Sequence, residues 1–209
     1  MSDNYIQILD YGIGNVRSLR NALDKIEINN IVDDKIDTND ENLKGLIIPG
    51  VGAFPAAMNL LNQKKLIESI VDLKNKNIPI LGICLGMQIL FEVGNEIKRT
   101  NGLKFIKGDV IPLDNEKMTV PNIGWRSISE NNNLFKNLNN KKFYFVHSFF
   151  ANPTNFNNVM YYTEYEKTKI PAIVKEKNIF GFQFHPEKSG EDGLILLKHF
   201  CKYSFEHNN

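Results

Sequence analysis

Residues 78–88 have the sequence Ile78-Pro79-Ile80-Leu81-Gly82-Ile83-Cys84-Leu85-Gly86-Met87-Gln88. The apolar run Ile78–Ile83 predicts a buried strand, and the residues from Met87 to Glu92 have a helix-like pattern. Gly-x-Cys-x-Gly stands between the two. A strand, a sharp turn and a helix in this order are typical of a nucleophile elbow, here with sulfur in place of the usual serine oxygen. We therefore expect Cys84 at the end of a strand in an α/β fold.

The glycines on both sides of Cys84 favour a catalytic cysteine. A nucleophile at such a turn has a strained backbone and crowded neighbours, and glycine tolerates both. The turn also places the thiol at a helix N-terminus, where the helix dipole favours the thiolate. The alternative is a small buried cysteine in a core strand, which the two flanking glycines disfavour.

A matching acid–base pair occurs far downstream, in His185-Pro186-Glu187. Alternation in residues 179–184 predicts a strand, and Pro186 ends it, so that His185 and Glu187 lie on the following loop. A cysteine nucleophile needs a base and an acid, and histidine can serve as both near neutral pH. Glu187 can orient the imidazole. An ordinary histidine and a solvated glutamate would explain each residue singly, but together they predict a triad with Cys84.

Length, charge and cysteine content narrow the class of protein. The 209 residues fit one compact domain, expected to span residues 1–209. The net charge of +1 gives no electrostatic argument for binding nucleic acid or an acidic membrane surface, and no apolar run approaches the ~20 residues that span a bilayer. Two cysteines make no disulfide framework and the N-terminus has no signal-peptide pattern, so a cytoplasmic protein without metal or cofactor is expected.

The first half of the chain alternates predicted strands and helices, and the second half is mostly short strands. The predicted strands are Tyr5–Leu9, Ile28–Val32, Gly45–Ile48, Phe105–Ile111, Ile123–Ile128, Lys142–His147, Met160–Thr163, Ala172–Lys175 and Ile179–Phe184. The predicted helices follow the first strand (Val16, Leu19, Leu23 and Ile26 on one face) and span Ala56–Leu61, Leu66–Asn75 and about Glu191–Tyr203. This order predicts an α/β fold with a mostly parallel central sheet, flanking helices and an added antiparallel portion.

With these motifs the chain resembles the class I, or triad-type, glutamine amidotransferases, whose fold is flavodoxin-like. Four further segments resemble one branch of that family, the glutaminase subunits of imidazole glycerol phosphate synthase. They are Asp10–Asn15, Pro49–Phe54, Pro121–Trp125 and Tyr144–Phe149. All of them occur in the family's order, so the resemblance covers nearly the whole chain.

The resemblance implies that the chain hydrolyses glutamine to glutamate and ammonia. Thiolate attack on an amide creates an oxyanion, which needs backbone N–H donors placed in advance. Leu85, directly after the nucleophile, is one expected donor, and the family match gives Val51 as the second. Gly50 and Gly52 would let the peptide between Gly50 and Val51 take two orientations, only one of which completes the oxyanion site. An ordinary tight turn would also use these glycines.

The same match implies the residues that hold glutamine. Gln88 lies one turn after Cys84 on the expected helix and can face the same pocket. Glu96 is a further candidate, although a solvated acid in the loop 95–101 is nearly as well supported. The remaining candidates act through the backbone, at Gly50, Gly52, Ser148 and Phe149.

The chain is expected to need a partner. Ammonia in neutral water is mostly ammonium, so it must reach its acceptor inside protein, and no second domain for an acceptor is evident. The resemblance implies a (β/α)₈-barrel cyclase in a heterodimer, which uses ammonia to make imidazole glycerol phosphate and an aminoimidazole carboxamide ribotide. The expected contact residues are Tyr11, Asn15, Asn122, Ile123, Trp125 and Lys188. An ordinary turn with a helix cap is the alternative for Tyr11 and Asn15. Trp125 could instead be a core residue, and Lys188 a solvated lysine.

Asn122 and Arg126 depart from the family pattern, which commonly has histidine and asparagine there. They leave open a paralogous subunit whose cyclase-like partner aminates a sugar or nucleotide-linked sugar in surface-polysaccharide synthesis. Two other classes are a cysteine peptidase of the same fold and a catalytically inactive scaffold. The intact triad argues against a scaffold, and Gln88, Ser148 and residues 49–52 argue against a peptidase.

Overall fold

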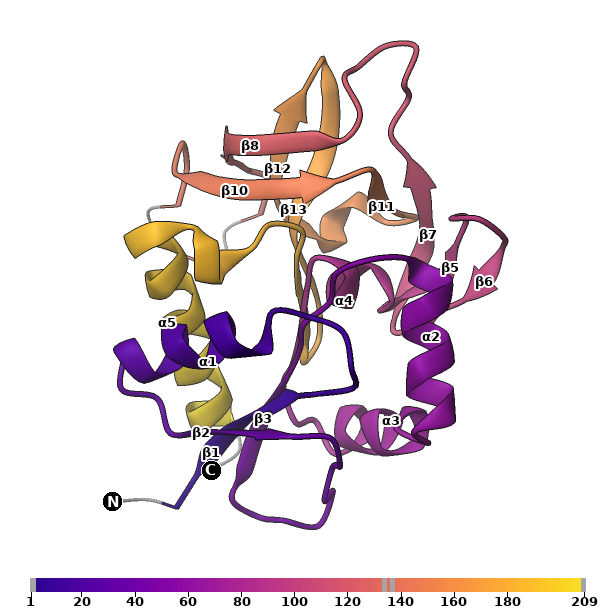
Figure 1. Ribbon diagram of the computed structural model, residues 1–209. Helices are drawn as coiled ribbons and strands as arrows, with labels where there is room; N and C mark the ends of the chain where they lie inside the picture. The colour runs from indigo at the N-terminus through magenta and orange to yellow at the C-terminus, as the bar shows by residue number, and fades with distance from the viewer. Residues whose placement is uncertain (1–2, 133–134, 136–137, 208–209) are drawn as a thin grey trace.

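The computed structural model describes residues 3–132, 135 and 138–207, and within them a central sheet of eight strands is the main feature (Figure 1). Its spatial order is β2 (Asn30–Asp33), β1 (Tyr5–Leu9), β3 (Leu43–Ile48), β4 (Ile80–Ile83), β14 (Ile179–Phe182), β13 (Thr168–Glu176), β12 (Val159–Tyr165) and β9 (Ser129–Glu130). The first five of these strands are parallel, and the last three continue the sheet in antiparallel pairs. The predicted α/β fold with a mostly parallel central sheet is confirmed.

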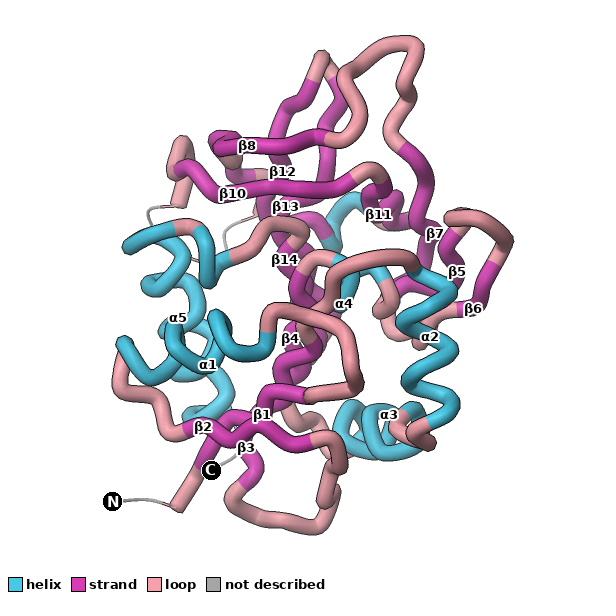
Figure 2. Tube along the Cα trace, in the orientation of Figure 1, coloured by secondary structure: helices cyan, strands magenta, loops and turns pink. Residues whose placement is uncertain are grey.

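Helices cover both faces of the central sheet. They are α1 (Val16–Lys25), α2 (Phe54–Gln63), α3 (Ile67–Asn75), α4 (Leu85–Gln88) and α5 (Gly190–His207). Figure 2 shows α1 and α5 on one face and α2 and α3 on the other. Strand side chains alternate between these layers: Ile47 packs in the cluster of α1 and α5, whereas Leu46 and Ile48 pack in that of α2 and α3. No helix in the described part of the chain has the length and apolar character to cross a bilayer.

Two smaller sheets lie beyond and beside the carboxyl ends of β4 and β14 (Figure 2). One is the antiparallel pair of β8 (Asn122–Ser127) and β10 (Lys142–His147), which we call the ribbon. The other has the order β11 (Phe149–Pro153), β7 (Ile106–Pro112), β5 (Phe91–Gly94) and β6 (Thr100–Asn101). Its β5–β7 pair is parallel and the other two pairs are antiparallel. The ribbon and this sheet enclose the site above the central strands.

The helix predicted from Met87 to Glu92 is wrong in its second half. The helix α4 ends at Gln88, and β5 begins at Phe91, which is fully buried and pairs with Ile106. A short apolar run fits either a helix or a strand, and here the pairing with β7 determines the outcome. The strands β6, β9 and β11 were not predicted either: β6 and β9 have two residues each, and β11 follows β10 after the single residue Ser148.

Candidate active site

Cys84 lies on a sharp turn between β4 and α4, at the carboxyl edge of the parallel strands. Its backbone φ is 55°, in the left-handed region that residues with a side chain rarely adopt. Two close backbone approaches hold this turn. A Cβ atom at Gly82 would lie 2.3 Å from the carbonyl oxygen of Gly86, and one at Gly86 would lie 1.9 Å from that of Ile48. The predicted strand–turn–helix geometry is confirmed, and the two glycines are required by contact with neighbouring backbone.

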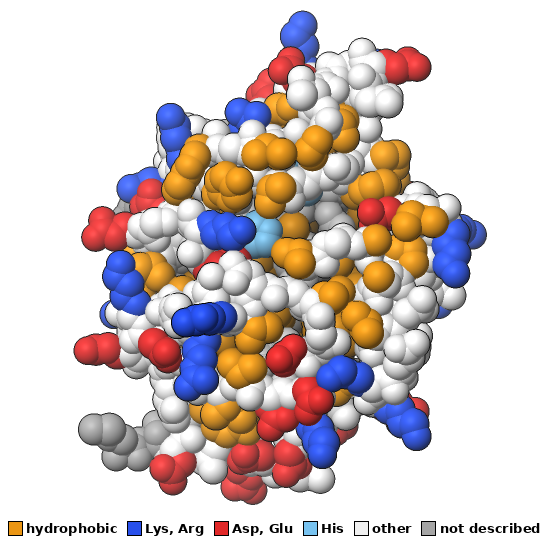
Figure 3. All heavy atoms as spheres, in the orientation of Figure 1, with side chains coloured by type: hydrophobic (Ala, Val, Ile, Leu, Met, Phe, Trp, Pro, Cys, Tyr) orange, Lys and Arg blue, Asp and Glu red, His pale blue; other side chains and the backbone are white. Residues whose placement is uncertain are grey.

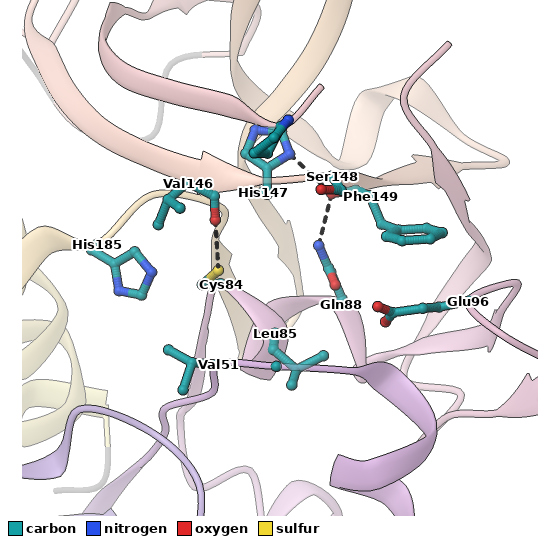
Figure 4. Close-up of a pocket in the computed structure, with 12 residues that line it drawn as sticks. Val51, Cys84, Leu85, Gln88, Glu96, Val146, His147, Ser148, Phe149 and His185 are labelled. Atoms are coloured by element: carbon teal, nitrogen blue, oxygen red, sulfur yellow. Dashed lines mark hydrogen bonds between the residues drawn. The ribbon is translucent and has the colours of Figure 1, made fainter. Parts of the chain in front are cut away.

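His185 and Glu187 form a buried hydrogen-bonded pair just after β14. His185 precedes the 3₁₀ turn η2 (Pro186–Lys188), and its Nδ1 lies 2.9 Å from Oε1 of Glu187. Both side chains are 3% exposed. A carboxylate only accepts, so Nδ1 carries a proton and donates. The other ring nitrogen, Nε2, has no partner among the described residues, and the ring lies beside Cys84 (Figure 4). Nε2 is therefore the nitrogen placed to exchange protons at the site.

Packing and hydrogen bonds from the ribbon fix the position of His185. The preceding residue, Phe184, stacks on Phe143 of β10 with ring centroids 4.2 Å apart, and burying such a ring contributes about 1.5–3 kcal/mol. The N–H of His185 donates to the Tyr144 carbonyl at 3.0 Å. Ser189 donates its hydroxyl to the carbonyl of His185 at 2.6 Å and accepts the Tyr144 N–H at 3.0 Å. The imidazole thus stands on a rigid support shared by β14 and β10.

The surroundings of His185 favour its charged form. Burial lowers the pKa of His185, but the neighbouring Cys84 and Glu187 raise it by more, to about 10. The ring is therefore an imidazolium at neutral pH. A proton is already present on the residue that faces Cys84.

A cavity of about 340 Å³ opens beside Cys84, a size that suits a small ligand. Figure 4 shows the sulfur between His185 on one side and Gln88 and Glu96 on the other. The substrate-binding residues predicted from the sequence that line it are Gly52, Gln88, Glu96, Ser148 and Phe149. Gly50 is not among the lining residues, because it lies against the elbow.

Gln88 and Glu96 are both held in place from behind. Gln88 donates from Nε2 to the carbonyl of Phe149 at 2.8 Å, which leaves its Oε1 as an acceptor for a ligand. Oε2 of Glu96 accepts the N–H of Phe54 at 2.7 Å, at the start of α2. The carboxylate is therefore fixed at a helix N-terminus, and the alternative of a solvated loop acid does not describe it. Together the two side chains can accept hydrogen bonds from a ligand ammonium group.

The two predicted oxyanion donors, Val51 and Leu85, both line the cavity of Cys84. Among the described residues, their backbone N–H groups donate to no other protein group. The segment before Val51 is anchored, because Tyr11 donates its hydroxyl to the Pro49 carbonyl at 2.9 Å. A Cβ atom at Gly50 would lie 2.7 Å from the backbone nitrogen of Gly86, so this segment touches the elbow. The two-state behaviour of the Gly50–Val51 peptide stays a prediction.

Three of the predicted partner contacts are accessible. Ile123 and Trp125 are 52% and 51% exposed on β8, where alternate side chains of the ribbon point outward. Lys188, directly after the His185–Glu187 pair, is also exposed. These positions allow contact with a second chain.

The other three predicted contacts have partners within this chain. Tyr11 and Asn122 are fully buried in the chain alone, so their contact with a partner stays a prediction. Tyr11 holds Pro49, and Asn122 lies 3.0 Å from Nε2 of His147. Asn15 caps α1 by accepting the N–H of Ser18, which agrees with the capped-turn alternative.

Two buried polar residues at the site were not predicted from the sequence. His147 lines the cavity, and burial lowers its pKa to about 4. Gln183 lies 3.3 Å from Gln88 and donates to the sulfur of Cys84 at 3.9 Å. Each is the polar member of an otherwise apolar strand end, Phe145-Val146-His147 or Phe182-Gln183-Phe184. A buried polar residue in such a run is the signal that could have identified them.

The chain matches the family model described as glutamine amidotransferase class-I over residues 3–202. It is 44% identical over 205 residues to the imidazole glycerol phosphate synthase subunit HisH of Lactococcus lactis subsp. lactis (strain IL1403), which covers 94% of this chain and 98% of that protein. The subunit of the same name from Caldanaerobacter subterraneus subsp. tengcongensis is 43% identical over 202 residues, covering 93% of this chain and 96% of that protein. These relatives cover nearly the full length of both proteins.

Solved structures support the same fold. One described as a glutamine amidotransferase superposes with a TM-score of 0.75 at 18% identity, covering 97% of this chain and 100% of the other. The structure of PurLQS from Thermotoga maritima gives a TM-score of 0.73 at 20% identity, covering 96% and 98%. The family match and the relatives span the elbow, the histidine–glutamate pair and the cavity, and on these grounds the chain belongs to the class I glutamine amidotransferase family.

Proposed function

We propose that this chain is the glutaminase subunit of an imidazole glycerol phosphate synthase, in which it converts glutamine and water to glutamate and ammonia. The observation that carries the proposal is the meeting of Cys84 and His185 at one cavity, from segments about a hundred positions apart, with Glu187 hydrogen-bonded to the far nitrogen of His185. Residues 1–209 act as one glutamine amidotransferase domain, since the family match spans 3–202.

In the first step, the sulfur of Cys84 attacks the side-chain amide carbon of glutamine. The carbonyl oxygen becomes an oxyanion, which accepts hydrogen bonds from the N–H groups of Leu85 and Val51. A donor that already points to the oxyanion costs little reorganisation when the charge develops, and the Gly50–Val51 peptide meets this condition in one of its two expected orientations. Losing one such donor typically slows catalysis by about 10²–10³-fold.

Protons then move through His185. The imidazolium gives its Nε2 proton to the amide nitrogen, the carbon–nitrogen bond breaks, and ammonia leaves a glutamyl thioester on Cys84. Nε2, now neutral, takes a proton from a water molecule that attacks the thioester. Glutamate leaves, the thiolate returns, and His185 is again charged. Glu187 stabilises the imidazolium throughout by accepting from Nδ1.

Glutamine is recognised at the opposite end of the cavity. The free Oε1 of Gln88 and the carboxylate of Glu96 accept hydrogen bonds from its ammonium group. The backbone of Gly52, Ser148 and Phe149 completes the walls. Because these groups lie away from the sulfur (Figure 4), they select the substrate without taking part in the chemistry.

A cyclase subunit with a (β/α)₈ barrel covers the exposed face of the ribbon. Figure 3 shows hydrophobic side chains gathered over β8 and β10, next to a hollow in which a histidine is visible. Trp125 and Ile123, on β8, are about half exposed, and Val51 at the cavity is 43% exposed. An apolar patch of this kind suits a protein interface, and a partner placed there receives ammonia directly from the cavity.

The relatives favour the histidine-pathway assignment over the sugar-aminating paralogue. Three of the most similar relatives carry the name imidazole glycerol phosphate synthase subunit HisH, at 37–44% identity. The chemistry at Cys84 would be the same with either partner.

The test is glutamate release by the chain alone and together with an imidazole glycerol phosphate cyclase subunit. We expect release that requires Cys84 and rises when the cyclase is added. If wild type and Cys84→Ala release equal amounts of glutamate in both conditions, the enzyme proposal is rejected. Release without any response to the cyclase would reject the assigned partner alone.

A further inference from the structure

A continuous series of hydrogen bonds connects the outer part of β8 with the wall of the cavity. The Nε of Arg126 donates to Oδ1 of Asn122 at 3.0 Å, and Nδ2 of Asn122 lies 3.0 Å from Nε2 of His147. Nδ1 of His147 lies 2.9 Å from the carbonyl oxygen of Phe149. Gln88 donates to that same oxygen at 2.8 Å. The proposed triad chemistry uses none of the first three side chains.

The ribbon register builds this series. Asn122 and His147 are directly opposite each other in the β8–β10 ladder, which brings their side chains together. Arg126 lies four residues along the same strand, and its guanidinium covers the ring of Tyr165 at 4.8 Å. Gly124 stands between Asn122 and Arg126 without a side chain, so the path from one to the other is open.

The direction of every hydrogen bond follows from the donors available. Arginine only donates, so Asn122 turns its oxygen to Arg126 and its NH₂ group to His147. Nε2 of His147 must then accept, and its proton is on Nδ1. That proton is donated to the Phe149 carbonyl, which cannot donate in return. The ring is neutral in this arrangement, in agreement with the lowered pKa of His147.

The series ends on groups that would touch glutamine. The carbonyl of Phe149 accepts from both His147 and Gln88, which uses both of its lone pairs. It thereby fixes the amide of Gln88 with Oε1 free, and it fixes the 148–149 wall of the cavity. Without His147, the Phe149 carbonyl would lose its hydrogen bond to the ribbon, and the amide of Gln88 and residues 148–149 would be less firmly held.

We propose that Asn122 and His147, with Arg126 behind them, are positioning residues that hold the glutamine-binding wall in its productive arrangement. The inference rests on the proposed function and deepens it, since it assigns affinity for the γ-glutamyl substrate to residues that do not contact the reacting atoms. Truncation of either buried residue leaves the next polar group without a partner, at a cost equivalent to about a tenfold loss of affinity.

The experiment uses two reagents that alkylate Cys84 on the full chain. The glutamine analogue 6-diazo-5-oxo-L-norleucine must occupy the glutamine pocket, so its labelling rate saturates with concentration. The saturation curve gives the dissociation constant of the analogue, called its binding constant below, and a maximal labelling rate. Iodoacetamide needs no pocket and reports only on the sulfur. For Asn122→Ala and His147→Ala we expect the analogue's binding constant to rise about tenfold, while its maximal rate and the iodoacetamide rate stay within about twofold.

Two further variants separate positioning from general stability. His147→Asn keeps an N–H donor near the place of Nδ1, and we expect it to recover most of the affinity that His147→Ala loses. Asn178→Ala is the matched control, because Asn178 is also buried and donates to two carbonyls, those of Lys74 and Ile78, at the opposite end of β14. It should lower stability without changing the binding constant. The KM for glutamine of the complex with the cyclase should follow the same pattern, with kcat nearly constant.

The outcomes are distinguishable. An unchanged binding constant in Asn122→Ala and His147→Ala, or an equal rise in Asn178→Ala, overturns the positioning role while leaving the enzyme proposal intact. If neither reagent labels Cys84 in wild type, the proposed function fails instead. Should the buried variants not fold by circular dichroism, Arg126→Met decides: about a threefold weaker binding constant supports the proposal, and no change rejects it.

Discussion

His185 and His147 lie at the ends of strands from different sheets, and both rings are buried at the same cavity (Figure 4). His185 follows the parallel sheet, next to Glu187 and Cys84, which raise its pKa to about 10 against the effect of burial. His147 ends the ribbon among the neutral amide of Asn122 and a carbonyl, and burial lowers its pKa to about 4. His185 carries protons on both ring nitrogens and is charged for catalysis, whereas His147 carries one, on Nδ1, and is neutral. Their polar partners, and not their depth, determine which is which.

The largest change in the difference between the two histidines is expected from a substitution of Glu187. Glu187→Gln replaces the carboxylate by an amide and gives His185 surroundings like those of His147. The pKa of His185 should fall, and glutamate release should drop by about 10³–10⁴-fold because the imidazolium loses its stabilising charge. Steady-state assays of the complex would measure this. A loss smaller than about tenfold would mean that Cys84 alone, and not the carboxylate, keeps His185 charged.

The second prediction concerns stability against pH. His147 has its folded pKa at about 4, below the ordinary value of about 6.5, so the unfolded chain binds the proton first. Its contribution to stability is therefore complete above about pH 6.5 and lost as the pH falls to about 4, by roughly 3 kcal/mol at most. Urea unfolding at intervals across this range would show it. In His147→Asn that part of the acid dependence should disappear.

His185 has the opposite sign. Its folded pKa, at about 10, lies above the unfolded value, so its contribution is complete below about pH 6.5 and lost as the pH rises towards 10. Glu187→Gln should flatten this alkaline dependence and change the acid one much less, because burial is the largest cause of the lowered pKa of His147 and the charge of His185 is the smallest. Equal effects of one variant on both limbs would contradict the separate assignment of the two histidines.

The residues of the site that follow the parallel strands were predictable from the sequence. Cys84 has glycines two residues away on each side, and His185 and Glu187 flank one proline. The local spacing alone is therefore enough to identify these three residues as candidates. The pair of polar residues on the ribbon was not predictable in this way. Asn122 and His147 are brought together by the register of β8 and β10, which no local pattern contains. For the same reason the strand β5 was predicted as helix, since pairing with β7 acts at long range.

A third variant makes the surroundings of His147 resemble those of His185. Asn122→Asp gives His147 a carboxylate, as Glu187 does for His185. The Asp oxygen beside Nε2 can only accept, so the ring should bind a second proton and its pKa should rise well above 4. Nitrogen-15 shifts of the His147 ring, followed by NMR against pH, would report this. An unchanged Nδ1–H tautomer titrating at about pH 4 would contradict the assigned hydrogen-bond directions.

The smallest effect is expected at Ser189, which joins the two halves. Its hydroxyl donates to the carbonyl of His185 and accepts from Tyr144 of the ribbon. Ser189→Ala removes both bonds and should cost about 1–2 kcal/mol of unfolding free energy and a few-fold in kcat, without moving the KM for glutamine. A larger change in KM than in kcat would show that Ser189 acts on the ribbon side of the site.

Trapping the intermediate would show directly whether Cys84 carries the glutamyl group. The chain assembled with its cyclase subunit would be mixed with glutamine, quenched in acid within milliseconds and digested for mass spectrometry. We expect a glutamyl thioester on the peptide that contains Cys84, which disappears on treatment with hydroxylamine and is absent from Cys84→Ala. Turnover of glutamine without any adduct on that peptide, or with undiminished turnover in Cys84→Ala, would contradict this expectation.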